Sequence, residues 1–207
     1  MTQEQEKFYY IKTYSDYDVV GDDIDYKVFV DHGPKEVVIQ FEESDSKQDW
    51  INNLLFIPFP LKLDNKIVWT TLGYARAYKS ANNALINEFC RIIEENPGYK
   101  VVIRGWSFGS AMAKILARHY VIRTLHDIDE LTTFGDVKCW LNPFYSVAKH
   151  CHRIREYAYI NDMVTWCVPF FWRDTTCHVG GRFSIKKLFN TEYNHTHYEE
   201  YDYSKYE

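Results

Sequence analysis

The sequence predicts an α/β protein with a mostly parallel, doubly wound sheet, and three observations lead to this prediction. Short runs of β-branched residues, such as residues 101–103, alternate along the chain with stretches of helical periodicity. The run at 101–103 passes into an alanine-rich helical stretch through Gly105-Trp106-Ser107-Phe108-Gly109. No internal repeat or linker interrupts the 207 residues. We therefore expect a single domain over residues 1–207.

The part of the chain before this motif contains the first predicted elements. Residues 1–25 are polar and rich in tyrosine, and we expect them to wrap around the body as irregular structure or a short helix. Residues 26–31 and 36–41 are predicted strands on either side of a His-Gly-Pro turn. Residues 74–96 are predicted to form one long amphipathic helix, which ends at an Asn-Pro-Gly sequence.

The part after the motif continues the alternation. Residues 131–136 and 155–160 are predicted strands, and residues 142–151 are predicted to form a short helix that begins at an Asn-Pro pair. Residues 177–185 are a last candidate strand with a bend at two glycines. The acidic tail at 192–207 is predicted to form a terminal helix. This order of strands and helices is typical of a doubly wound sheet.

The Gly-x-Ser-x-Gly pentapeptide has the chemistry of a nucleophile. A strand that turns sharply into a helix crowds its flanks, so glycines at 105 and 109 let the backbone pass while Ser107 takes a strained, exposed position. This is the nucleophile elbow of α/β-hydrolases. The amide of Phe108 would then point toward a developing oxyanion at a helix N-terminus, where negative charge is favoured. A βα turn without a catalytic role is the alternative interpretation.

Composition and charge limit the classes of function. The chain is 46% hydrophobic and 26% charged, as expected of a globular protein, and its net charge of −5 argues against binding to nucleic acids or anionic membranes. It has no N-terminal apolar region of a secretory signal and no apolar run long enough for a membrane span. The five cysteines lack CxxC spacing and are predicted to be reduced thiols. We therefore expect a cytoplasmic protein.

We expect neither a metal nor an organic cofactor. The sequence His150-Cys151-His152 could suggest metal ligands, but adjacent side chains on an extended segment diverge. Solvated or packed side chains are the favoured interpretation of this tripeptide.

Several segments together resemble the class 3, fungal-type lipases, which have the α/β-hydrolase fold. The resemblance covers residues 26 to 205, and the joint order of its motifs is more specific than any one of them. The motifs that carry it are, in chain order, Phe41-Glu42-Glu43-Ser44 with Asp49-Trp50 and Asn53-Leu54, Leu72-Gly73-Tyr74, the pentapeptide, Thr133-Phe134-Gly135, Asn161-Asp162-Met163-Val164, His178-Val179-Gly180 and Asn194-His195 with Tyr198.

The chain also departs from the pattern of this family. Glu42 and Glu43 replace Arg-Gly in the loop that would approach the oxyanion. Trp106 stands where histidine is usual, Phe108 where leucine is usual, and Thr71 where a further histidine is usual. These departures leave a serine triad intact, and they bear on the oxyanion loop and on the range of substrates.

Ester hydrolysis by serine needs a base to take its proton and a carboxylate to orient that base. Asp162 follows the strand predicted at 155–160, which is the position such an acid needs. A plain Asn-Asp turn is the alternative, because this pair is common after strands.

Three histidines compete for the role of base. His178 lies inside a predicted strand, and the resemblance implies that it is a packed core residue instead. Thr196 and Glu199 have the spacing of a capping box, which would leave His195 in a loop and His197 in the first helical turn. An imidazolium is disfavoured at a helix N-terminus. The match to the terminal motif also favours His195, while His197 stays open.

For the oxyanion hole, the resemblance nominates Ser44 together with the amide of Phe108. The apolar segment that follows, within residues 45–60, is a candidate lid over an acyl pocket, and core packing of a short helix is the alternative. In a lid, this segment would make transient contact with a lipid interface.

These observations predict a serine ester hydrolase, a lipase or carboxylesterase that cleaves acyl-lipid esters through an acyl-enzyme. Ser107 would attack, His195 would move the proton, and Asp162 would orient His195. The rival hypothesis is a hydrolase fold kept as a binding module with weak or no catalysis. Its support is Glu42-Glu43, two carboxylates next to the place where negative charge must develop.

Overall fold

A central sheet of seven strands organises the chain. The computed structural model describes residues 1–21, 24–42, 56–81, 83–166, 171, 172, 176–180, 183, 184, 187, 190–204 and 206. The spatial order of the strands is β1-β2-β3-β6-β7-β8-β9, and all neighbours from β3 to β9 are parallel. The strands are β1 (Asp18–Val20), β2 (Ile24–Asp31), β3 (Glu36–Phe41), β6 (Lys100–Trp106), β7 (Ile128–Phe134), β8 (Cys151–Tyr159) and β9 (Thr176–Val179).

The buried apolar runs form the middle of this sheet. Val37 pairs with Val101 and Ile39 with Ile103 in the parallel register of β3 and β6, and all four side chains are buried. Strands covered on both faces consist of continuous apolar residues, as these do. The mostly parallel, doubly wound sheet expected from the sequence is confirmed.

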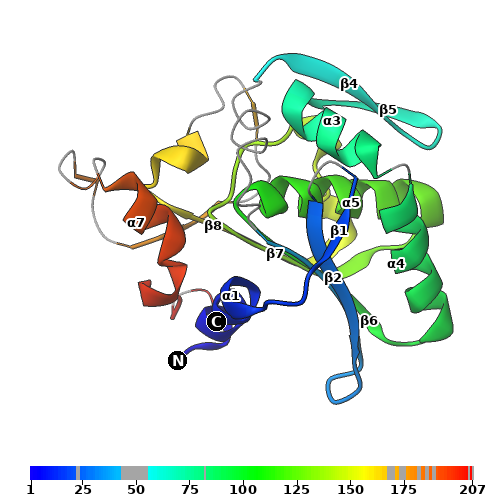
Figure 1. The fold of residues 1–207 in the computed structure, drawn as a ribbon, viewed down its shortest axis with the longest axis horizontal. Helices are drawn as coiled ribbons and strands as arrows, with labels where there is room; N and C mark the ends of the chain where they lie inside the picture. Colours follow the sequence, from blue (N-terminus) through cyan, green and yellow to red (C-terminus); the bar gives the residue numbers. More distant parts are fainter. Residues whose placement is uncertain are drawn as a thin grey trace.

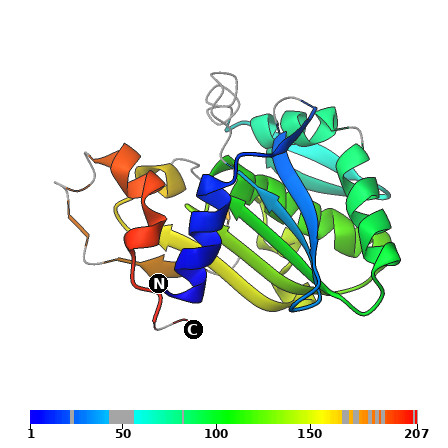
Figure 2. The same ribbon diagram turned by 60° about the horizontal axis from the view of Figure 1, so that its bottom comes forward.

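Helices cover both faces of the sheet, as Figures 1 and 2 show. On one face, the longest helix packs against β6 and β7 and is joined by two shorter helices. On the other face, the N-terminal helix lies beside the C-terminal one, over a second apolar cluster. The helices are α1 (Gln3–Thr13), α3 (Leu72–Ser80), α4 (Ala84–Glu95), α5 (Phe108–Thr124) and α7 (Thr191–Thr196).

The N-terminal wrap contains a regular helix, α1. Thr2 and Gln5 form a capping box at its start, in which each side chain bonds the backbone amide of the other residue. Phe8 and Ile11 on its inner side are fully buried. The short helix expected within residues 1–25 is therefore present, but this stretch also contains strand β1 and the start of β2, which were not expected.

The long helix predicted at 74–96 is wrong, because two helices occupy this stretch. α3 ends at Ser80, and α4 begins after Asn83, whose backbone φ is +63°. Asparagine tolerates this left-handed conformation better than most residues, so the chain turns here. The apolar spacing hid the break because both helices bury residues in the same core cluster.

A hairpin outside the central sheet was also missed. Strands β4 (Pro58–Leu63) and β5 (Lys66–Thr71) pair antiparallel around a turn in which Asp64 has a φ of +48°. Proline is tolerated in an edge strand, where no partner needs its missing N–H. The end of the candidate lid segment, residues 58–60, thus belongs to β4. Residues 45–55 of that segment lie outside the described residues.

Two further predictions fail in detail. The helix predicted at 142–151 is two 3₁₀ turns, Pro143–Tyr145 and Ala148–His150, and the chain enters β8 at Cys151. The terminal helix predicted at 192–207 is the short α7, followed by a 3₁₀ turn at Tyr198–Glu200. A further 3₁₀ turn, Met163–Trp166, follows β8. Among the described residues, no helix has both the length and the apolar character needed to cross a bilayer.

Candidate active site

The turn from β6 into α5 has the geometry of a nucleophile elbow. Ser107 occupies it with φ +55° and ψ −120°, a conformation that L-residues rarely adopt. A Cβ atom at Gly105 would collide with the carbonyl of Gly109, and a Cβ atom at Gly109 would lie 2.6 Å from the carbonyl oxygen of Glu42. Both glycines are therefore required for strand, turn and helix to pack this closely.

A hydrogen-bonded chain joins three residues that are far apart in the sequence. His195 Nε2 lies 2.6 Å from Ser107 Oγ, and His195 Nδ1 lies 2.7 Å from Asp162 Oδ2. All three side chains are buried, so the strained position expected for Ser107 is present but the exposed one is not. A carboxylate can only accept, so Nδ1 carries the proton and Nε2 is left to accept from the serine hydroxyl. This is the arrangement that a serine nucleophile and its base need.

The carboxylate of Asp162 is held by two further donors. The backbone amide of Val164 donates to its Oδ1 at 3.0 Å, and the hydroxyl of Tyr198 donates to its Oδ2 at 2.9 Å. Burial, followed by the negative charge of Asp162, raises the pKa of Tyr198 well above its ordinary value. The phenol therefore stays protonated and remains a donor. Sequence reasoning missed this role, although Tyr198 belongs to the terminal motif that carried the resemblance.

The histidine arrives on α7, not on a loop. Thr196 does not cap a following helix: its hydroxyl donates to the carbonyl of Glu192, within α7 itself. The capping-box argument is therefore wrong. The asparagine before the histidine fixes the segment, since Asn194 Nδ2 donates to the carbonyl of Asn161 at 3.0 Å. This bond ties the segment that carries His195 to the turn that carries Asp162.

The other two candidate bases lie elsewhere. The ring of His197 stacks on Tyr193 with 4.0 Å between centroids, and its Nδ1 lies 2.9 Å from Thr196 Oγ1. His178 is exposed on β9, because its neighbours Cys177 and Val179 take the two buried positions around it. The expectation that His178 is a packed core residue is wrong. Neither histidine has a bond to Ser107 or Asp162 among those that join the described residues.

The turn after β7 packs directly against the imidazole of His195. Gly135 has a φ of +54°, and a Cβ atom there would lie 2.8 Å from Cε1 of His195. The neighbouring Asp136 accepts a bond from Lys114 Nζ at 2.8 Å, deep inside the protein, where Glu156 lies 4.0 Å from the same amine. Burial disfavours the charged amine, but the two carboxylates outweigh this effect and raise the pKa of Lys114. This buried ion pair anchors the turn against α5.

The candidate oxyanion donors are the amide of Phe108 and Ser44. The amide of Phe108 is one of the first four in α5, which have no acceptor within the helix, and it sits at the positive end of the helix dipole. The ring of Phe108 packs against Tyr74, which fixes the first turn of the helix. Ser44 lies outside the described residues.

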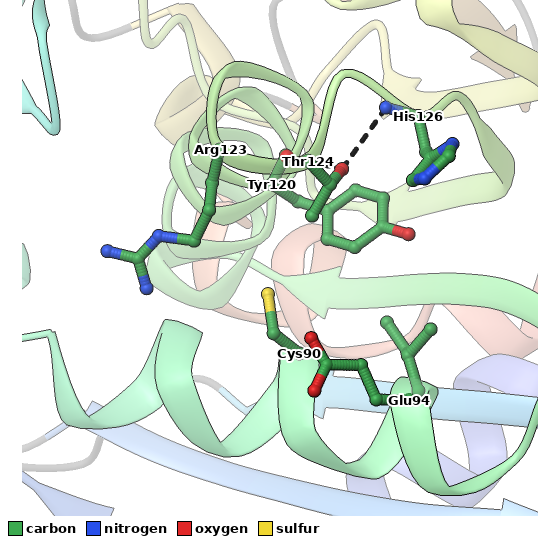
Figure 3. A pocket seen from close by; sticks show the side chains of 7 residues that line it. Cys90, Glu94, Tyr120, Arg123, Thr124 and His126 are labelled. Atoms are coloured by element: carbon green, nitrogen blue, oxygen red, sulfur yellow. Dashed lines mark hydrogen bonds between the residues drawn. The ribbon is translucent and has the colours of Figure 1, made fainter.

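A cavity of about 400 Å³ lies away from this site, between α4 and the C-terminal turn of α5. Figure 3 shows Cys90 and Glu94 on α4 facing Tyr120 and Thr124 on α5. Because α5 rises about 1.5 Å per residue, the cavity residues on this helix are roughly 20–25 Å from Ser107. It is not the substrate site of the serine. Across the described ranges, no three His, Cys, Asp or Glu side chains are grouped to hold a metal ion.

The fold and the elbow geometry define this chain as an α/β-hydrolase. Comparison with known families places it more narrowly: the lipase (class 3) family matches residues 38–171, which is more than half of the chain. The chain belongs to the class 3 lipase family. The resemblance inferred from the motifs is thus confirmed, although His195 lies beyond the matched residues.

Individual relatives agree with this assignment. The secreted mono- and diacylglycerol lipase A of Penicillium cyclopium and that of Penicillium camembertii are each 29% identical over 90 residues, which cover 44% of this chain and 29% of the relative. Among solved structures, a Rhizomucor miehei lipase in complex with its propeptide superposes with a TM-score of 0.68 at 21% identity, over 81% of this chain and 55% of that one. A triacylglycerol lipase described as having a serine protease triad gives 0.65 at 22%, over 79% and 64%. The chain thus spans less than two thirds of each of these relatives.

Proposed function

We propose that this protein is a serine ester hydrolase that cleaves acyl-lipid esters through an acyl-enzyme. The observation that carries the proposal is the continuous bonding from Ser107 Oγ through His195 to Asp162, at 2.6 and 2.7 Å. Ser107 is the nucleophile, His195 the general base and acid, and Asp162 the group that orients His195. Family membership supports an ester as the substrate.

In the first half of the reaction, Ser107 Oγ bonds to the carbonyl carbon of the ester while His195 Nε2 takes the hydroxyl proton. The resulting imidazolium is stabilised by Asp162. Collapse of the tetrahedral intermediate breaks the bond to the alcohol, which leaves with the proton from Nε2. In the second half, water loses a proton to the same nitrogen and attacks the acyl carbon. Collapse of this second intermediate breaks the bond between the acyl carbon and Ser107 Oγ, which takes the proton from Nε2, and the acid is released.

The oxyanion of each intermediate would accept a bond from the amide of Phe108. One such donor contributes about 3 kcal/mol to transition-state stabilisation. Ser44 is proposed as the second donor because the resemblance nominates it. Its substitution by alanine, which keeps the backbone amide, tests only the contribution of its hydroxyl.

The proposed substrates are glycerolipids, whose acyl ester bonds would be cleaved, because relatives are named for acting on mono-, di- and triacylglycerols. Transient contact with a lipid interface remains part of this proposal, with the part of the candidate lid segment 45–60 that precedes β4 as the lid. A lid predicts that the rate jumps when the substrate concentration passes the solubility limit. A smooth saturation curve through that limit would instead indicate an esterase without interfacial activation.

The experiment that tests the proposal is hydrolysis of p-nitrophenyl esters with acyl chains from short to long. Ser107→Ala should abolish the activity while leaving the melting temperature unchanged, because one hydroxyl contributes little packing. His195→Ala should lower kcat by about 10³ or more, and His197→Ala should behave as wild type. Activity of Ser107→Ala within tenfold of wild type would contradict the proposal.

The cytoplasmic location is a further prediction that these comparisons do not support. Both curated relatives are named as secreted lipases. Cys90 and Cys177 are free thiols, which is compatible with a reducing compartment. Fractionation of the cells that make the protein decides between the two locations.

A further inference from the structure

Two successive backbone carbonyls beside the imidazole are held by side chains of other elements. Trp106 Nε1 donates to the carbonyl of His195 at 3.2 Å. Lys12 Nζ donates to the carbonyl of Thr196 at 2.7 Å. Trp106 is the last residue of β6 and Lys12 lies in the last turn of α1, so the two donors come from elements that are far apart in the sequence and far from residues 195 and 196.

Lys12 also bonds the histidine segment, residues 190–201, at a second point. Its amine lies 2.7 Å from Glu199 Oε1, and both side chains are about three-quarters buried. The other carboxylate oxygen of Glu199 is buried without a hydrogen-bond partner among the described residues. The positive charge of Lys12 thus compensates the poorly solvated negative charge of Glu199. The same Nζ atom binds both Thr196 and Glu199.

The rest of α1 fixes the position of Lys12. The ring of Phe8 meets Trp106 edge-on at 5.3 Å and packs against Tyr198 at 5.7 Å. Gln5 Nε2 donates to the carbonyl of Tyr201 at 3.1 Å. α1 is therefore docked along residues 196–201 through Gln5, Phe8 and Lys12, and Figure 2 shows the N-terminal helix beside this C-terminal part of the chain.

The histidine segment depends on such contacts for its position. α7 has six residues, and an isolated helix of that length is not stable in water. The imidazole it carries must meet two partners, at 2.6 and 2.7 Å, at the same time. A shift of about 1 Å would lengthen one or both bonds and lower the rate of proton transfer.

We propose that Lys12 and Trp106 are positioning residues for His195, which hold its backbone so that the imidazole bridges Ser107 and Asp162. This inference rests on the proposed function. α1, a helix of the N-terminal wrap, would then contribute to the reaction by positioning the base. Trp106, which stands where the family usually has histidine, would contribute through its N–H donor.

Kinetics on a soluble ester, p-nitrophenyl butyrate, test the proposal. Lys12→Met removes the amine and keeps the length of the side chain, whereas Lys12→Arg keeps the charge and the donors. We expect Lys12→Met to lower kcat about tenfold with KM changed less than about twofold, and Lys12→Arg to recover most of the loss. Trp106→Phe, which loses only the N–H donor and part of the ring, should also lower kcat at nearly constant KM.

Lys27→Met is the matched control. Lys27 is similarly buried and also forms ion pairs, with Asp16 and Asp18, but it lies on β2, next to the edge strand β1, and these partners are outside residues 190–201. Its kcat should stay within about twofold of wild type. If Lys12→Met and Trp106→Phe both keep the wild-type kcat, or if Lys27→Met loses as much, the positioning role is wrong.

A second measurement does not depend on activity. Hydrogen–deuterium exchange of peptides covering residues 190–201 should be faster in Lys12→Met and Trp106→Phe than in wild type, and unchanged in Lys27→Met. Unchanged exchange in both variants would overturn the proposal even if the enzyme is inactive. If the wild type is inactive but exchange is faster in the variants, the proposed function is wrong, while the role of Lys12 and Trp106 in holding residues 190–201 is supported.

Discussion

Removal of the Tyr198 hydroxyl should lower the free energy of unfolding by an amount that follows from its two hydrogen bonds. Tyr198 is fully buried, and its hydroxyl donates to Asp162 Oδ2 at 2.9 Å while accepting the backbone amide of Tyr159 at 2.8 Å. Tyr198→Phe removes both bonds without changing the shape of the ring. A bond to a charged group contributes about 1.5–3 kcal/mol, and a buried amide without an acceptor costs about 1–3 kcal/mol. We expect a loss of roughly 3 kcal/mol in the free energy of unfolding.

Tyr203→Phe provides the control for this variant. Tyr203 is equally buried and lies in the same segment, but its hydroxyl donates only to the neutral carbonyl of Tyr198, at 2.7 Å. Its loss should be about 1 kcal/mol. Urea unfolding measures both values, and the melting temperature of Tyr198→Phe should fall by about 6–12 °C. A loss for Tyr198→Phe no larger than that for Tyr203→Phe would refute the argument that this hydroxyl supports the carboxylate.

Three further predictions follow from the surroundings of the imidazole and from the core. Gly135→Ala should lower kcat by about 10²-fold, because its Cβ would press on His195, and steady-state kinetics near the wild-type value would contradict that contact. Lys114→Met should cost about 3–5 kcal/mol in urea unfolding by leaving Asp136 buried without its cation, and the added change Asp136→Asn should recover part of the loss. Burial lowers the pKa of His119 below its ordinary 6.5, so the unfolded chain takes up a proton that the folded chain does not. Stability should therefore fall as the pH drops below about 6.5, and urea midpoints of His119→Gln should fall less over the same range.

The local pattern around Ser107 was sufficient to predict the elbow. Its glycines, the β-branched strand before it and the small residues after it all require the same turn. Asp162 and His195 could be selected because hydrolases use a fixed chain order and because Asp162 follows a strand. The reason given for His195 was wrong in part, since Thr196 bonds back into α7. The terminal motif selected the histidine whose ring bonds to Ser107 and Asp162.

The failures share a physical cause, because they depend on contacts between distant segments. Apolar spacing continued through Asn83, so the break between α3 and α4 depended on one left-handed residue. Residues 58–60 were assigned to the candidate lid segment, whereas Pro58 and Pro60 lie in the edge strand β4. Trp106 could be recognised as a departure from the family but not as a donor to His195. The bond between Lys12 and Thr196 had no signal in the sequence at all.

Other predictions from the sequence stay predictions. The single domain over 1–207, the lid at 45–60 and the hydroxyl or amide of Ser44 as an oxyanion donor all await experiments. The binding-module hypothesis drew on Glu42 and Glu43, and only Glu42 lies among the described residues. The backbone carbonyl of Glu42 is close to the position that a Cβ at Gly109 would take, so the backbone at Glu42 packs directly against the elbow.

Covalent labelling with a fluorophosphonate tests the central claim most directly, because the reagent reacts with a serine that an adjacent base has activated. Intact-protein mass spectrometry should show one phosphonyl adduct on the wild type, and peptide mapping should assign it to Ser107. His195→Ala should react about 10³-fold more slowly, and His197→Ala at the wild-type rate. The absence of an adduct on folded wild-type protein, or the same adduct on Ser107→Ala, would contradict the account.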